Sequence, residues 1–146
     1  MQYFQLFARN ALYLILLIGY SLSLTSCAKK VSFITSGVVP AAQGYIKISE
    51  DDNHNYTVDV NIKRLAEPSR LNPPKETYVV WMETKRNGTK NLGRLNSSSG
   101  FFSSSLQALL HAVTPFKPER VFVTAENQSN IQTPGSQVVL TTKEFH

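Results

Sequence analysis

The chain has 146 residues, with fifteen Lys and Arg against ten Asp and Glu and a single cysteine. One cysteine excludes an intramolecular disulfide and any cluster of thiolate metal ligands, so we expect packing to supply the stability. The length fits one small domain behind a short leader.

The first element in the chain is an uncharged apolar run from Ala11 to Leu24, and Arg9 is the only charged side chain before it. A positive start, a short apolar run and then small polar residues is the layout of a secretory signal peptide. A membrane-spanning helix usually needs about 20 apolar residues. This run ends in serines before that length, so spanning is the weaker alternative.

The end of that run, Leu24-Thr25-Ser26-Cys27, resembles the lipobox of bacterial lipoproteins, in which leucine and small residues precede an obligatory cysteine. The resemblance implies a diacylglyceryl group on the thiol, cleavage before the cysteine and acylation of the new amino terminus, for example with palmitate. We therefore expect Cys27 to be the lipidation site and Leu24, Thr25 and Ser26 to direct processing. The alternative is a stray thiol behind an ordinary signal peptide.

These assignments place the protein in the bacterial cell envelope, anchored to a membrane through the lipid on Cys27 and facing away from the cytoplasm. We expect residues 1–26 to be the signal peptide, residues 27–41 a lipidated tether that lifts the domain off the headgroups, and residues 42–146 a β-sandwich. Removal of Arg9 would leave fourteen basic and ten acidic side chains, a dispersed net charge of +4. We expect this charge to aid attraction to the membrane surface, and we expect no nucleic-acid partner.

The first predicted hairpin joins residues 43–49 and 56–63 through the polar turn 50–55. In the second strand Tyr56, Val58, Val60 and Ile62 alternate with polar residues, the period of a half-buried strand. Residues 31–35 are a weaker candidate for an edge strand. Three prolines in residues 65–75 predict a longer crossover loop.

The second predicted hairpin joins residues 77–84 and 89–95. The first of these strands is apolar on both faces, as expected inside a sheet. Asn87-Gly88 favours a turn with positive φ at both positions.

The remaining sequence predicts a serine-rich loop at residues 96–105, then a short helix or a strand at 103–113, then strands at 120–126 and 137–142. Short strands at regular spacing, separated by turn signals, predict an all-β fold. We expect an antiparallel immunoglobulin-like sandwich of about seven strands.

Several segments resemble the extracytoplasmic domain of anti-sigma-K-like factors over roughly residues 43–142. They are Tyr78-Val-Val-Trp81, Asn87-Gly88, Leu92-Gly-Arg-Leu95, Thr114 to Glu126 and Pro134 to Leu140. The resemblance implies a β-domain outside the cytoplasm with an interaction or sensing role. Only ten residues precede the apolar run, too few for the sigma-binding unit of that family. The resemblance is therefore taken to imply only the fold, the location and the interaction or sensing role, and it assigns no functional residue.

Candidate sites have competing explanations. Asp51, Asn53 and Asn55 have the spacing that opens a calcium loop, but Tyr56 stands where the glycine belongs and Ile62 where the glutamate belongs. We therefore expect an ordinary hairpin turn. His54, His111 and His146 are scattered in the sequence, and we expect no metal site and no cofactor.

No catalytic motif is recognisable in the sequence. The serines lack the Gly-x-Ser-x-Gly pattern. Trp81 with Tyr45, Tyr56 and Tyr78 could stack on a sugar ring, but we expect Trp81 to pack between the sheets. The leading expectation is a non-catalytic lipoprotein that binds an envelope protein or senses the envelope. The alternatives are a weak glycan- or ligand-binding lipoprotein and a hydrolase whose Ser, His and carboxylate meet only in the fold.

Overall fold

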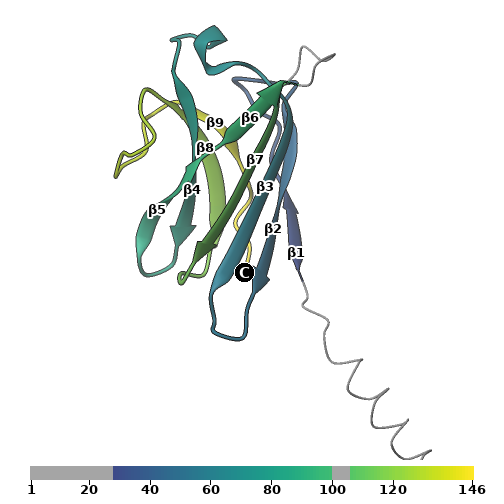
Figure 1. Cartoon of the computed structure of the whole chain (residues 1–146), viewed down its shortest axis with the longest axis vertical. Helices are drawn as coiled ribbons and strands as arrows, with labels where there is room; N and C mark the ends of the chain where they lie inside the picture. Colours follow the sequence, from purple (N-terminus) through teal and green to yellow (C-terminus); the bar gives the residue numbers. More distant parts are fainter. Residues whose placement is uncertain (1–27, 100–105) are drawn as a thin grey trace, which may run out of the picture.

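The computed structural model describes residues 28–99 and 106–146, and in these ranges the chain is built of antiparallel strands without an α-helix. Figure 1 shows the strands in two facing layers. One sheet has the order β1 (Lys29–Ser32), β2 (Gln43–Glu50), β3 (Tyr56–Leu65), β7 (Leu106–Thr114), β6 (Asn96–Ser99). The other has the order β5 (Gly88–Arg94), β4 (Thr77–Thr84), β8 (Arg120–Glu126), β9 (Val138–Thr141). The predicted all-β antiparallel sandwich is confirmed.

The strand order is that of an immunoglobulin-like domain, whose two sheets contain strands ABED and CFG. Here β2, β3, β7 and β6 take the places of A, B, E and D, while β4, β8 and β9 take those of C, F and G. β5 adds a strand beside β4, and β1 extends the other sheet beyond β2. The fold therefore has nine strands in the described residues rather than about seven.

The core lies between the two sheets and is filled by alternate residues of the central strands. From β3 it receives Val58, Val60 and Ile62, and from β8 it receives Val121 and Val123, all at most 2 % exposed. The predicted period-two pattern of β3 is confirmed, as is its hairpin with β2. Burying each such side chain contributes about 1.5–3 kcal/mol, so this apolar layer accounts for the closure of the sandwich.

The second predicted hairpin is present, but its turn differs from the expected one. β4 and β5 pair from Thr84 opposite Gly88, and Gly88 alone in this turn has a positive φ, of 68°. Asn87 instead keeps negative φ, and its amide donates to the Thr84 hydroxyl over 3.0 Å. A three-residue loop followed by a left-handed glycine is the next commonest hairpin connection.

Residues 96–99 and 106–114 form two strands where a serine-rich loop and a short helix were candidates. Asn96–Ser99 pairs with β7 as the edge of its sheet, and β7 pairs along its length with β3. The strand alternative for this segment is therefore correct and the helix is wrong. Ser97 and its neighbours are all polar, so the alternation of apolar and polar residues that predicts a strand is absent. A short polar edge strand of this kind cannot be predicted from its own sequence. Residues 100–105 lie outside the described residues.

The segment expected to be a tether is mostly part of the sandwich. β1 begins at Lys29 and pairs with β2, and Phe33 then bridges to Thr142 beside β9. Ser36 is buried, and its hydroxyl donates to the Val139 carbonyl over 2.5 Å. Backbone pairing of the sandwich therefore starts at Lys29, thirteen residues before the expected boundary at residue 42.

Trp81 is buried, but not between the sheets. It forms a second cluster with Val79 and Phe122 on the outer face of the four-stranded sheet, with Ile131 packed against them. The rings of Trp81 and Phe122 stack with centroids 6.5 Å apart. β4 is apolar on both faces because the loop 127–137 covers the face that the core does not.

Gly44 in β2 offers a test of the close pairing of β2 with β3. A Cβ atom at Gly44 would lie 2.5 Å from the carbonyl oxygen of Asn61 on β3, so an alanine must push the two strands apart. We expect Gly44→Ala to lower the free energy of unfolding by about 1–3 kcal/mol, measured by urea unfolding. Gly37→Ala is the matched control, because its Cβ would have no atom within 4 Å. Equal stability of the two variants would contradict this close contact.

Candidate functional site

Cys27 and the processing residues Leu24, Thr25 and Ser26 lie outside the described residues, but the chain fixes how far Cys27 is from the sandwich. Lys29, the first residue of β1, follows Cys27 by two positions. Two residues of extended chain span at most about 7 Å. Any lipid on Cys27 would therefore be attached directly beside the first strand.

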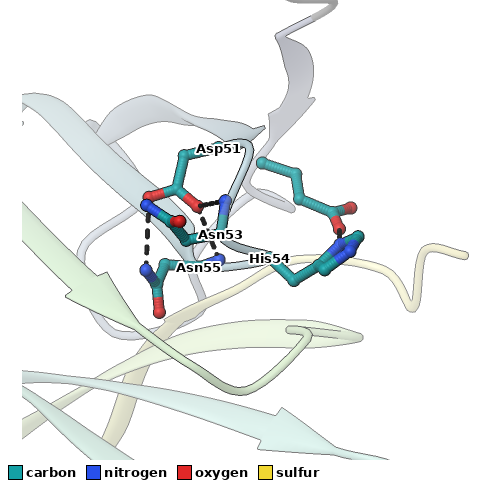
Figure 2. Close-up of polar contacts among 5 residues, drawn as sticks. Asp51, Asn53, His54 and Asn55 are labelled. Carbon is teal, nitrogen blue, oxygen red and sulfur yellow. Dashed lines mark hydrogen bonds and ion pairs between the residues drawn. The ribbon is translucent and has the colours of Figure 1, made fainter.

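The candidate calcium loop is a hairpin turn held by the carboxylate of Asp51 (Figure 2). Its Oδ1 accepts the amides of Asn53 over 2.9 Å and Asn55 over 2.8 Å, and its Oδ2 accepts the Asn55 side chain over 3.2 Å. Hydrogen bonds from Asn55 and Asn53 lower the pKa of Asp51. His54 takes the left-handed conformation that closes the turn, with φ of 61°. The polar residues of this turn thus satisfy its backbone, as expected for Asp and Asn.

The histidines do not converge. His54 Nδ1 lies 2.7 Å from Glu50 in the same turn, and His111 Nδ1 lies 2.6 Å from Asp59 on the neighbouring strand β3. Its hydrogen bond to the carboxylate of Glu50 raises the pKa of His54. Within residues 28–99 and 106–146, no three His, Cys, Asp or Glu side chains are grouped so that they could hold a metal ion.

Trp81 belongs to a buried polar chain that ties the loop 127–137 to the sheet. Its indole N–H donates to the Thr124 hydroxyl over 2.8 Å, and that hydroxyl donates to Glu126 Oε1 over 2.6 Å. The amide of Gly135 donates to the same Glu126 oxygen over 2.7 Å. The loop is also held from β5, where the Asn91 side chain donates to the carbonyls of Ser129 and Ile131. This arrangement is a structural support for the loop.

The aromatic residues considered for sugar stacking do not form a common platform. Trp81 is 0 % exposed and Tyr78 only 3 % exposed. The hydroxyl of Tyr78 donates to the Ala66 carbonyl over 2.9 Å, and burial raises its pKa to about 12. Tyr45 is half-buried under the ammonium group of Lys30, which lies 4.0 Å from its ring centroid. Stacking by Trp81 and Tyr78 is therefore blocked in this fold.

The most distinctive surface is the end of the sandwich at which β1 begins, which we call the basal end. It is formed by the turn 51–55, the turn 85–87, the loop 115–119 and residues 143–146, and Figure 1 shows these segments at the same end of the two layers. A pocket of about 510 Å³ there is lined by Lys85, Arg86, Asn87, Lys117, Glu119 and His146. A second pocket of about 160 Å³ shares Lys117 and His146 and reaches Lys29.

This convergence of cations could not be recognised in the sequence. Lys85 and Arg86 belong to the β4–β5 turn, while Lys117 lies between two prolines more than thirty residues later. The basic pairs at 29–30, 63–64 and 85–86 stand out in the sequence, but nothing in it shows which of them lie together. The common location of the pair at 85–86 and Lys117 follows from the antiparallel pairing of β4 with β8, which sets Glu83 opposite Arg120 and so brings the turn 85–87 and the loop 115–119 to the same end.

Comparisons with protein-family models, curated proteins and solved structures give no match. The resemblance to anti-sigma-K-like extracytoplasmic domains therefore stays a prediction from the sequence. Among the described residues, no helix has the length and apolar character needed to cross a bilayer.

The Asp51 turn makes a prediction about acid stability. The folded pKa of Asp51 lies below its ordinary value of 3.8. Its contribution is therefore present above that value and is lost as the pH falls through the lowered pKa. We expect Asp51→Ala to lower the urea midpoint at neutral pH and to approach the wild type in strong acid. Asp52→Ala, a change in the same turn, should be nearly neutral, and a loss equal to that of Asp51→Ala would contradict this role.

The buried polar chain makes a second prediction. Thr124→Val keeps the shape of the side chain but removes the hydroxyl that joins Trp81 to Glu126. Because the indole N–H and one carboxylate oxygen then lose a buried partner, we expect a loss of about 1–3 kcal/mol in the free energy of unfolding. Urea unfolding followed by circular dichroism would measure it. The control is Thr57→Val, the same change on the half-exposed face of β3, and equal losses would contradict the bridging role.

Proposed function

We propose that this protein is a lipid-anchored lipoprotein of the bacterial cell envelope. Its immunoglobulin-like sandwich would then serve as a non-catalytic module for protein interaction or envelope sensing. The observation that carries the proposal is the sequence Leu24-Thr25-Ser26-Cys27 at the end of an apolar run. The start of the sandwich at Lys29 supports it, since a folded domain begins where the lipobox would end.

The proposal that the protein is not a catalyst is supported by the contacts of its polar residues, which in the described ranges hold turns and loops in place. Asp51 holds a turn, and Glu126 holds the loop 127–137. His54 and His111 each face one exposed carboxylate, and no hydrogen bond of the described residues adds a serine to either pair. A serine hydrolase would need such a third group.

The interaction role is supported by the fold and by the resemblance to anti-sigma-K-like extracytoplasmic domains. Immunoglobulin-like sandwiches present loops at both ends of two rigid sheets, a common arrangement for binding surfaces. We propose a protein of the envelope as the partner. The sigma-factor pathway of that family is not part of the proposal.

The anchor is tested by replacing its one sulfur atom. We expect Cys27→Ala to move the protein out of the membrane fraction, because two or more acyl chains at about 0.8 kcal/mol per methylene group are what hold it there. Fractionation of the cells followed by immunoblotting would measure the change. Intact mass spectrometry of the wild type should show an acylated chain that begins at Cys27.

Ala28→Ser is the matched control, since it alters the neighbouring residue and leaves the thiol. It should stay in the membrane fraction. A Cys27→Ala protein that remains membrane-bound, or a wild type with an unmodified Cys27, would refute the lipid anchor.

A further inference from the structure

We propose that the basal end of the sandwich lies against the membrane and that Lys85, Arg86 and Lys117 contact anionic phospholipid headgroups. This inference rests on the proposed lipid anchor at Cys27. It adds an orientation of the domain, a lipid class and the side chains that recognise it.

The length of the connection determines which end faces the bilayer. Acyl chains on Cys27 lie in the membrane, and Lys29 is at most about 7 Å of extended chain away. Lys29 already pairs with Ile48 near the basal end of β2. The segment expected to act as a spacer is largely folded into the sheets, so the domain cannot stand well clear of the headgroups.

Of the exposed cations at the basal end, which also include Lys29 and Lys143, three lie together for such contact. Lys85, Arg86 and Lys117 are all exposed, and together they line the pocket of about 510 Å³. Among the described residues, none of the three forms an ion pair within 4.0 Å. Glu119 is the one acidic side chain in the lining of this pocket. Phosphate groups match this chemistry, because guanidinium and ammonium groups donate several hydrogen bonds to their oxygens.

The basal end also has an acidic side, which predicts how the domain tilts on the membrane. Glu50, Asp51 and Asp52 lie at the β2–β3 turn, and among the described residues only Glu50 of these three forms an ion pair, with His54. Glu50 also shares the lining of the smaller basal pocket with Lys117. An anionic bilayer attracts juxtamembrane cations by about 1 kcal/mol each and repels carboxylates. The domain should therefore tilt so that the turn 85–87 approaches the headgroups and the turn 51–55 is held away.

Charge alone would not select the basal end. The opposite end, which we call the distal end, carries Lys63, Arg64, Arg70, Lys75 and Arg94. Arg70 lies 3.6 Å from Glu67, and Arg64 donates to Gln43. The distal cations are a full strand length from Lys29, so the chain connection keeps them off the membrane. They provide a control surface of similar charge.

The test uses the full lipidated chain reconstituted into vesicles of phosphatidylcholine, with or without phosphatidylglycerol. A fluorophore is placed on a single new cysteine at Asn87→Cys, Asn53→Cys or Ser69→Cys, and a lipid with a spin-labelled headgroup quenches it. Cys27 does not react, because its sulfur carries the lipid. On anionic vesicles we expect the label at position 87 to be quenched about twofold more than at 53 and about threefold more than at 69. On neutral vesicles the difference between 87 and 53 should vanish.

The charge-reversed variant Lys85→Glu, Arg86→Glu, Lys117→Glu should lose the excess quenching at position 87. The matched control Lys63→Glu, Arg70→Glu, Lys75→Glu makes the same change in net charge at the distal end. It should keep the excess quenching at position 87. Raising the salt concentration on the unaltered chain is a second measurement that needs no variant, and it should equalise positions 87 and 53.

Equal quenching at 87 and 53 on anionic vesicles would overturn the headgroup contact, and equal quenching at 69 and 87 would overturn the orientation. Intact mass spectrometry of the same sample shows whether Cys27 is acylated, and this separates the two proposals. An acylated chain without basal contact rejects this inference alone. An unmodified Cys27 without vesicle binding rejects the lipid anchor and this inference together.

Discussion

The apolar layer between the two sheets is the constraint on which the rest of the molecule depends. With one cysteine there is no disulfide to hold the sheets, so the alternate side chains of β3 and β8 must do so by packing. That packing fixes the register of β3 against β2 and β7, and through it the position of every turn. Gly44 shows how closely β2 and β3 pair within their sheet, because even one methyl group there would collide with the backbone of β3.

Much of this fold was predictable from residue alternation and turn residues. Tyr56 to Ile62 alternates cleanly because one face of β3 meets the core and the other meets water. The pattern fails for Asn96–Ser99, whose pairing is set by β7, and for Trp81, since a strand that is apolar on both faces does not reveal which face a loop will cover. The spacing of Asp51, Asn53 and Asn55 was correctly interpreted as a turn, because the missing glycine and glutamate argued against calcium.

The surface features were less predictable, because they depend on where separate loops meet. Lys85 and Lys117 come from different connections, and only the strand order brings them to one pocket. The start of the sandwich was also hard to predict from composition. Residues 28–41 are rich in small and polar residues, as a spacer would be, yet β1 gains its stability from the exposed edge of β2 rather than from its own composition. A short edge strand of this kind is specified by its neighbour.

The placement of the only tryptophan has a practical consequence for spectroscopy. Trp81 lies beneath the loop 127–137 and outside the layer between the sheets. Its emission therefore reports whether that loop is seated, while the far-ultraviolet signal of the strands reports whether the sheets remain paired. If the loop opens before the sandwich does, the two signals will change at different denaturant concentrations, and a two-state treatment of fluorescence alone would then misjudge how cooperative the domain is.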